Sequence, residues 1–349
     1  MGQDALSDVL RGVRLRGAVF FNISGSSDWA AEAPAGGELA PLLMRGVDHV
    51  VEYHAVVRGS CWAGIPDGPM VQLHAGDIVM FPHGDAHVVS SSPGLRGSLD
   101  MDWIAGVRRQ PLPLRLAYSG SAISMPPDAA PVDSSDTAIV CGFLGCDLRP
   151  FNPLISALPR LMHLRADVED GWIAGFVHQA VAESHARRPG GEAMLARMSE
   201  MMFVDAVRRF ADQQPAHTTG WLAGLRDRFV GRALALMHDQ PEHQWTLEEL
   251  GRLVGLSRSA LHDRFVELVG VAPMHYLAQW RMQAASRLLL ESKAGVAAIA
   301  LEVGYESEAA FSRAFKRLVG QPPGAWRRGR EAGWGPPGQS PRARSGSTA

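Results

Sequence analysis

The sequence contains two similar stretches, LEELGRLVGLSRSALHDRF (residues 247–265) and AAIALEVGYESEAAFSRAF (residues 297–315). The similarity continues downstream in aromatic, glycine and proline residues at matching offsets: Phe265, Gly270, Pro273 and Tyr276 in the first copy, and Phe315, Gly320, Pro323 and Trp326 in the second. The second copy carries one additional residue after its turn glycine. This internal repeat predicts two copies of one small structural unit.

Each copy predicts a helix, a short glycine turn and a second helix. In the first copy an apolar stripe precedes Gly255, and Ser257 stands where a helix N-cap is expected. The second copy repeats this order with Gly304 and Ser307. Four apolar residues should anchor the second helices in the core: Leu261, Phe265, Phe311 and Phe315. The order is typical of the helix-turn-helix unit of DNA-binding proteins.

The segment between the copies, HYLAQWRMQAASRLLLES (residues 275–292), has no Pro or Gly and has apolar residues at helical spacing. At about 1.5 Å per residue, such a helix spans roughly 27 Å. Successive major-groove segments on one face of DNA are roughly 34 Å apart. The segment is therefore suited to hold two recognition helices in neighbouring grooves.

Together these motifs resemble the AraC/XylS family of bacterial transcription regulators over about residues 225–330. The residues that carry the resemblance are GLSRSALHDRF, the connecting YLAQWRMQAASRLL, and GYESEAAFSRAFKRLVGQPPGAWR. The resemblance implies two helix-turn-helix subdomains, sequence-specific binding to double-stranded operator DNA, and activation by contact with RNA polymerase.

Carried over by position, the resemblance gives the candidate DNA-binding residues: Ser257, Arg258, Ser259, His262 and Asp263 in the first unit, and Ser307, Glu308, Ala309, Ser312 and Arg313 in the second. Arg313 is the strongest single candidate because a guanidinium binds guanine or phosphate through two hydrogen bonds. The alternative is that these arginines are ordinary solvated charges. The second recognition helix is rich in alanine and acidic residues, so we expect the first unit to dominate specificity.

The charge distribution agrees with a C-terminal DNA-binding region. Residues 1–220 contain 17 Lys and Arg against 24 Asp and Glu, whereas residues 221–330 contain 15 against 11. The local net charges are therefore −7 and +4, although the whole chain carries only −2. A polyanionic partner is expected at the C-terminal third.

The remaining segments predict a multidomain α+β protein. Short apolar stretches from about residue 13 to 120 predict a β-sandwich or β-barrel, with a loop over residues 121–137. Residues 153–212 have helical periodicity with a break at RRPGGE, and residues 212–220 resemble a linker. The expected units are a cupin-like sensing domain (1–150), a helical connector and possible homodimer interface (151–220), a DNA-binding domain (221–330) and a disordered tail (331–349).

GDIVMFPHGDAH (residues 76–87) resembles the second sequence motif of cupin barrels, and Glu52 with Gly59 matches the end of the first motif. The HxH pair of the first motif is absent, since residues 45–48 read RGVD. The sequence therefore predicts no metal and no cofactor, with Glu52, His54 and His87 as the residual candidate ligands. Glu52 and His54 should share one strand face by period-two alternation.

Cys61 and Cys141 join His54 and His87 as effector or redox candidates. The leading interpretation is that these thiols, with Cys146, are buried small apolar side chains. The alternative is an oxidant or electrophile switch, because GSCWAG, GDIVMFPHGDAH and VCGFLGC resemble the cupin-type sensor half of a subgroup of AraC regulators.

The predicted function is a cytoplasmic transcription regulator, an activator rather than an enzyme, whose barrel senses a small molecule or a redox or electrophile signal. Three cysteines without a disulfide framework favour a reducing compartment, and no apolar stretch predicts a membrane span. One alternative is a metal-dependent cupin enzyme with a DNA-binding tail. Another is an architectural DNA protein, which the acidic N-terminal half disfavours.

Overall fold

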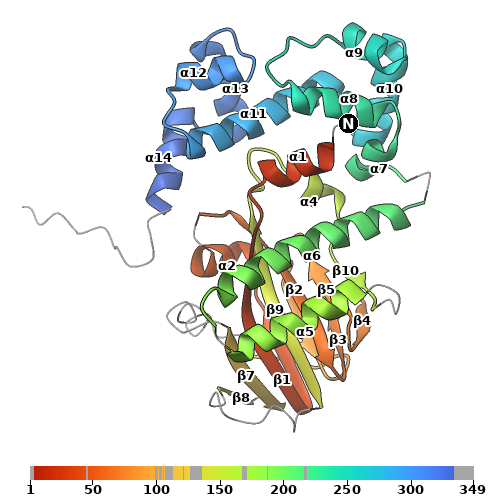
Figure 1. Cartoon of the computed structure of the whole chain (residues 1–349), viewed down its shortest axis with the longest axis vertical. Helices are drawn as coiled ribbons and strands as arrows, with labels where there is room; N and C mark the ends of the chain where they lie inside the picture. The colour runs from red at the N-terminus through yellow and green to blue at the C-terminus, as the bar shows by residue number, and fades with distance from the viewer. Residues whose placement is uncertain are drawn as a thin grey trace, which may run out of the picture.

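A computed structural model describes the chain over residues 4–44, 46–98, 101, 104, 106, 113–120, 122–125, 136–166, 171–186, 188–215 and 218–333. The N-terminal part forms a strand-rich body, and the C-terminal helices lie above it (Figure 1). Among the helices in these ranges, none has both the length and the apolar character needed to span a bilayer.

Ten strands form the body within the described residues. They are β1 (Arg16–Ala33), β2 (His49–Arg58), β3 (Ser60–Gly64), β4 (Met70–His74), β5 (Ile78–Phe81), β6 (His87–Ser90), β7 (Leu114–Gly120), β8 (Ala122–Ser124), β9 (Thr137–Cys146) and β10 (Met162–Leu164). Their order is β10-β5-β2-β9-β1-β6-β3-β4, while β7 pairs with β1 and β8.

Strand β1 closes the sheet because it serves two sets of neighbours. Its first half pairs with β9, and residues 30–33 pair with β6. Register shifts interrupt its pairing at Val19/Phe21 and at Ser26/Trp29. Because such irregularities bend a strand, β1 turns a corner and the sheet curls. Apart from the parallel β1–β7 pair, the strand pairs are antiparallel, and the predicted cupin-like barrel is confirmed as a nearly closed one.

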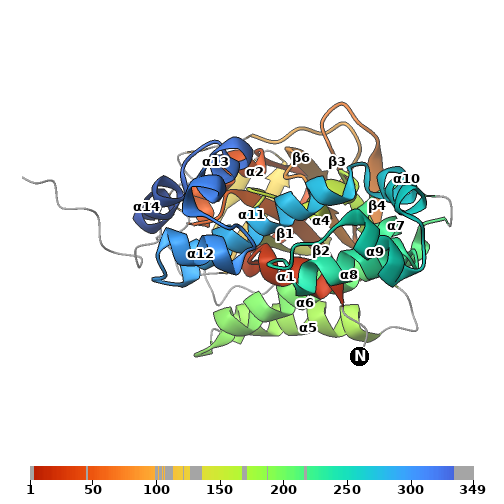
Figure 2. The same ribbon diagram turned by 90° about the horizontal axis from the view of Figure 1, so that it is seen from above.

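Helices α5 (Gly171–Ala186) and α6 (Gly191–Gln213) lie together on one side of the barrel (Figure 2). A Cβ on Gly17 would lie 2.2 Å from the carbonyl oxygen of Ala196, so the glycine permits α6 to approach β1 closely. The buried hydroxyls of Tyr53 and Ser199 are 2.7 Å apart and add a polar link between β2 and α6. Phe203 of α6 is fully buried in the same contact region.

The C-terminal helices have the order that the repeat predicts. They are α7 (Trp221–Arg226), α8 (Val230–Asp239), α9 (Leu247–Val254), α10 (Arg258–Val269), α11 (Pro273–Glu291), α12 (Val296–Glu302), α13 (Glu308–Val319) and α14 (Pro323–Gly333). Gly255 adopts φ 85°, and the Ser257 and Ser307 side chains accept hydrogen bonds from the backbone at the starts of α10 and α13. The two predicted helix-turn-helix units, α9–α10 and α12–α13, are confirmed.

A short N-terminal helix, α1 (Ala5–Gly12), lies between the barrel and the C-terminal helices (Figure 1). Beside it the buried side chain of Gln283, on α11, donates a hydrogen bond to the Gly12 carbonyl at 2.8 Å. The same side chain accepts one from the Phe151 backbone N–H at 3.1 Å. Gln283 therefore connects the helix between the two DNA-binding units to two segments of the barrel domain.

Several sequence-based boundaries were wrong. The strand-rich N-terminal region also contains α2 (Gly36–Leu43), and α1 precedes it. The helical region includes α4 (Pro153–Ala157) but also strand β10, whose three residues are too few to show a period and which forms because β5 offers an edge. The expected 121–137 loop contains β8, while its residues 121 and 126–135 lie outside the described residues.

The predicted tail begins too early, since α14 continues to Gly333. Trp326 is buried in the core of the second unit, and Arg327 donates hydrogen bonds to the Leu289 and Ala294 carbonyls, so this helix is anchored. The rest of the predicted tail, residues 334–349, lies outside the described residues.

Candidate DNA-binding surface and barrel site

Helices α10 and α13 present the predicted DNA-binding residues on their outer sides. Their inner sides are anchored by fully buried residues at the expected positions: Leu261 and Phe265 on α10, and Phe311 and Phe315 on α13. Because each helix is fixed by its cap and its apolar face, the opposite face is available for a partner.

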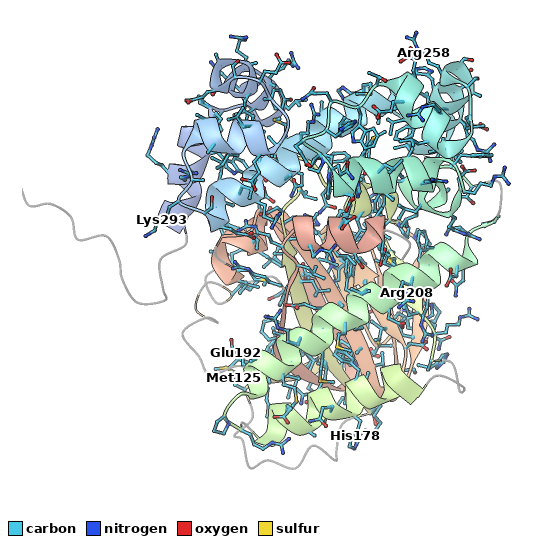
Figure 3. All side chains as sticks on the ribbon, turned by 45° about the horizontal axis from the view of Figure 1, so that its top comes forward. Met125, His178, Glu192, Arg208, Arg258 and Lys293 are labelled. Atoms are coloured by element: carbon cyan, nitrogen blue, oxygen red, sulfur yellow. The ribbon has the colours of Figure 1, made fainter. Side chains whose placement is uncertain are left out.

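On α10, Arg258, Ser259 and Asp263 are exposed, and the capping Ser257 is exposed before it. Arg258 points outward from the top of the molecule, away from the barrel (Figure 3). Its guanidinium lies 3.1 Å from the Glu248 carboxylate, but both side chains are more than half exposed. Such a surface pair contributes little, so the arginine can exchange it for a phosphate or base. His262 is half-buried and lies 3.1 Å from the Asp263 carboxylate.

On α13, Glu308, Ala309 and Arg313 are exposed, Ser312 is half-buried, and Ser307 is the exposed cap. Within the part of the chain that the structure describes, no carboxylate pairs with Arg313. The acidic Glu308 lies at the start of the same helix, where it would repel a phosphate. The two units thus offer similar scaffolds with different charge on their outer faces.

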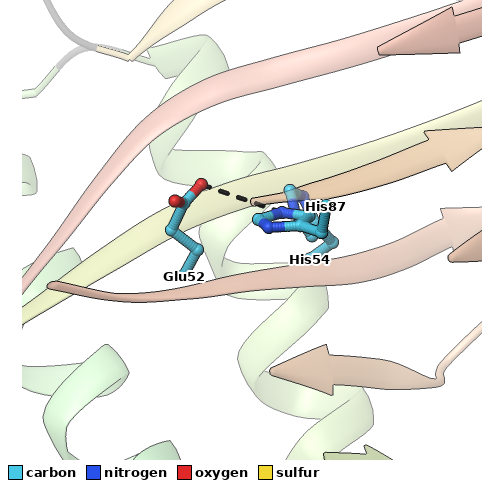
Figure 4. Close-up of side chains that lie close together, drawn as sticks. All are labelled: Glu52, His54 and His87. Atoms are coloured by element: carbon cyan, nitrogen blue, oxygen red, sulfur yellow. Dashed lines mark hydrogen bonds and ion pairs between the residues drawn. The ribbon is translucent and has the colours of Figure 1, made fainter. Parts of the chain in front are cut away.

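The barrel brings the candidate sensing residues together. Glu52 and His54 come from β2 and His87 begins β6, and Figure 4 shows the three side chains converging. Their exposed fractions are 2%, 7% and 1%. The Nε2 atoms of His54 and His87 are 2.6 Å apart, and a Glu52 oxygen lies 3.8 Å from His87 Nε2. One ligand atom from each residue lies within 4.8 Å of the others, so these three residues could hold a metal ion.

A hydrogen-bond chain passes through both imidazoles. His87 Nδ1 lies 2.9 Å from the Asp85 carbonyl oxygen, which can only accept, so this nitrogen carries the proton. His87 Nε2 is then the acceptor from His54 Nε2–H. His54 Nδ1 in turn accepts from the Cys141 thiol, whose sulfur lies 2.8 Å away. The order of donors is fixed when both rings are neutral.

Burial keeps these groups uncharged. It lowers the pKa of His87 to about 4 and holds the pKa of His54 well below its ordinary value. It also raises the pKa of the Glu52 carboxyl and of the Cys141 thiol well above their ordinary values. A charged form would lose water without a compensating partner, so the neutral network is the stable one.

A cavity of about 80 Å³ opens beside this network. Its walls are mainly apolar and include Phe21, Ile23, Tyr118 and Phe143, while Glu52, His54, His87 and Cys141 contribute polar groups. The aromatic wall was not predicted from the sequence, although the alternation in AVFFNI would have placed Phe21 and Ile23 on one strand face.

The three cysteines, Cys61, Cys141 and Cys146, are free and buried, as the leading interpretation held. Cys61 shares an apolar cluster with Cys141, whereas Cys146 belongs to the cluster on the other side of β9. Only Cys141 among them lines the cavity.

Comparison with known families assigns the two halves separately. The Cupin family model matches residues 4–212, and the Helix-turn-helix domain model matches residues 250–329.

Individual relatives match along most of the chain. A putative AraC-like transcription regulator of Streptomyces lividans is 29% identical over 328 residues, which cover 93% of this chain and 98% of that protein. The RCS-specific HTH-type transcriptional activator RclR of Escherichia coli is 27% identical over 328 residues, 93% of this chain and 97% of its own length. Among solved structures, the DNA-binding domain of AdpA in complex with a target DNA is 31% identical, has a TM-score of 0.29, and covers 30% of this chain and 95% of that one.

Proposed function

The chain belongs to the cupin-containing AraC-like transcription regulators, and from this premise we propose that it is a sequence-specific transcription activator controlled by its barrel. It binds operator DNA through α10 and α13 and activates by contact with RNA polymerase. The observation that carries the proposal is the pair of capped, outward-facing recognition helices held by one continuous helix, α11. The ten residues predicted from the family resemblance supply the contacts to bases and phosphates.

Each domain has a separate role in this proposal. Residues 1–150 sense the effector, residues 151–220 transmit the signal and form a homodimer, and residues 221–330 bind DNA, in the cytoplasm. The exposed Met194 and Met201 on α6 support a subunit contact there, since large apolar side chains are costly to leave in water.

The sensing step uses Cys141 as its reactive group toward an oxidant or electrophile in the cavity. Burial raises the pKa of this thiol, so its reaction depends on His54 Nδ1 accepting the thiol proton. Modification of the sulfur removes the S–H donor, so the hydrogen bond from Cys141 to His54 Nδ1 is lost. The arrangement therefore couples chemistry at one sulfur to the packing of β2, β6 and β9.

Strand β9 carries the change toward the DNA-binding helices. Just beyond its end, the Asp147 carbonyl accepts a hydrogen bond from Asn152, and its carboxylate pairs with Arg14 at 2.6 Å. The neighbouring Phe151 N–H binds Gln283 on α11. A shift of β9 thus reaches the helix that sets the separation of the two recognition helices, which allows the two barrel states to bind DNA with different affinity.

The test is selection of DNA from a randomised duplex library with the purified full-length protein, once with a thiol reductant and once with a mild oxidant. We expect a two-part motif spaced by about one helical turn, enriched to different extents under the two conditions. Absence of any enriched motif would refute sequence-specific binding.

The redox part has its own matched variants. Cys141→Ser should remove the difference between reductant and oxidant, while Cys146→Ser, another buried thiol on β9, should retain it. If Cys141→Ser responds like the wild type, the sensing role of this thiol is wrong even when the DNA motif is found.

A further inference from the structure

One oxygen of the buried barrel carboxyl lacks a partner. Glu52 is 2% exposed, and its Oε1 atom makes no hydrogen bond, while its other oxygen lies 3.8 Å from His87 Nε2. An unsatisfied buried carboxyl is costly, and buried carboxyl groups that persist are usually paired or bind a cation. The orphaned oxygen therefore marks a position for a ligand.

The nitrogen donors around this oxygen are oriented like those of metal sites. His87 is held by its Nδ1–H bond to the Asp85 carbonyl, which leaves Nε2 facing His54 and Glu52. His54 Nδ1 lies against Cys141 Sγ, so its Nε2 faces the same point. Binding of an ion at this Nε2 requires the other tautomer of His54, with the proton on Nδ1 and donated to the sulfur. An outer partner on the second ring nitrogen is what fixes a histidine ligand and its tautomer.

We propose that the barrel binds one divalent first-row transition ion through Glu52, His54 and His87, with Cys141 and the Asp85 carbonyl as positioning groups. Two imidazole nitrogens and one carboxylate oxygen form a donor set that suits zinc and its neighbours. The set differs from the cupin motif in that His54 follows the glutamate, whereas the histidine pair expected before the glutamate is replaced by RGVD.

The geometry requires a small adjustment. Two nitrogens bound to one tetrahedral ion are about 3.3 Å apart, whereas the two Nε2 atoms are 2.6 Å apart, so the rings separate by less than 1 Å when the ion enters. The adjacent cavity of about 80 Å³ provides the remaining coordination position. The inference deepens the proposed function, since an ion here changes the hydrogen bond between His54 and the reactive Cys141.

The test is metal binding by the purified full-length protein after treatment with EDTA. Zn²⁺ is titrated in competition with a chromogenic chelator, and the visible spectrum of the Co²⁺ form reports coordination. We expect one tightly bound equivalent per chain, lost in His87→Ala and in the nearly isosteric Glu52→Gln. Cys141→Ala, which removes the outer partner of His54, should weaken binding by about 10- to 100-fold.

His74→Ala is the matched control, because His74 is an exposed histidine on the same barrel and should bind zinc like the wild type. Circular dichroism identifies any variant that fails to fold. If His87→Ala fails to fold, the loss of zinc binding is tested with Glu52→Gln alone. Absence of a bound equivalent in the wild type, or wild-type affinity in both ligand variants, overturns the inference. Retention of DNA selection by a protein that binds no zinc refutes the metal site and leaves the proposed regulator intact.

Discussion

The two helix-turn-helix units come from one repeated sequence pattern, but they are integrated differently into the molecule. The buried residues of α9 and α10 belong to a core that continues into α1, the outer face of the barrel and α6. Those of α12 and α13 form a separate core with the C-terminal half of α11 and with Trp326. A change in the barrel therefore reaches the first unit through direct packing and the second unit through α11.

The matching aromatic positions show the difference in detail. Tyr276 of the first unit accepts a hydrogen bond from Trp221 at 2.9 Å and lies 2.8 Å from His238 Nε2, so it connects α7, α8 and α11. Trp326 occupies the same position of the second unit, where its ring packs against Phe315 at 6.2 Å. The Tyr276 ring also packs against Phe151, just beyond β9, at 5.3 Å. This repeat position therefore joins the first unit to the barrel side of the molecule, whereas in the second copy it remains a local core residue.

Truncating the equivalent phenylalanine in each unit should show the difference between the units most clearly, because this change has the largest expected effect on stability. Phe265→Ala and Phe315→Ala each remove a fully buried ring and should cost about 3–5 kcal/mol. Because the second unit has its own core, Phe315→Ala should produce a separate early transition in scanning calorimetry. Phe265→Ala should lower the transition that includes the barrel.

Limited proteolysis provides the check on which part has opened. In Phe315→Ala, early cleavage should fall within residues 292–333 while the barrel stays resistant. A single, shared transition in Phe315→Ala would mean that the second unit is as tightly joined to the barrel as the first.

The pH dependence of the free energy of unfolding provides a second test of the difference between the units. The expected effect is smaller than that of the phenylalanine variants and comes from the first unit. Burial lowers the pKa of His238 to about 3, and its ring stacks on Trp280 at 3.9 Å. Its folded pKa lies below the unfolded value of about 6.5, so the stabilisation is complete above pH 6.5 and is lost as the pH falls toward 3. The His238 contribution should fall by about 2 kcal/mol between pH 7 and pH 5.

Urea unfolding of the wild type and of His238→Gln at the two pH values isolates this contribution, because the buried His54 and His87 titrate alike in both proteins. The glutamine retains an acceptor for the Tyr276 hydroxyl. The exposed His275→Gln is the control and should keep the full wild-type dependence. An unchanged slope in His238→Gln would show that this histidine is already protonated in the folded protein.

The contrast between the units also explains what sequence could predict. Caps such as Ser257, turn glycines such as Gly255 and the long α11 depend on local preferences, so the repeat located both units. The period-two pattern placed Glu52 and His54 on one face, and both are buried together. These features could be predicted because they depend on interactions between residues that are close together in the sequence.

The remaining features depend on contacts between distant segments. Gln283 has no local signature as a link, since its partners at Gly12 and Phe151 are far away in sequence. The Cys141–His54 contact likewise depends on the register between β2 and β9, in which these two residues are paired. Strand β10 forms only because β5 leaves an edge for it, and its three residues carry no period of their own.

The smallest expected difference, about tenfold in affinity between two variants, concerns the unequal outer faces of the units. Arg258→Ala and Arg313→Ala each remove a candidate base or phosphate contact, with a cost of about 1–3 kcal/mol in binding to the selected operator. The acidic Glu308 lies at the start of α13, whereas the carboxylate near Arg258 is the exchangeable Glu248 of α9. We therefore expect Arg258→Ala to weaken binding about tenfold more than Arg313→Ala, measured by titration of labelled duplex at fixed salt.

The two half-sites distinguish specificity from general attraction. If Arg258 contacts bases, its loss should relax the preference at one half of the two-part motif and leave the other half unchanged. If it contacts only phosphate, affinity should fall equally for all sequences and the salt dependence should become less steep. A larger loss in Arg313→Ala would reverse the assignment. It would mean that the unit less tightly packed on the barrel provides the main sequence contact, so that the barrel controls specificity only through α11.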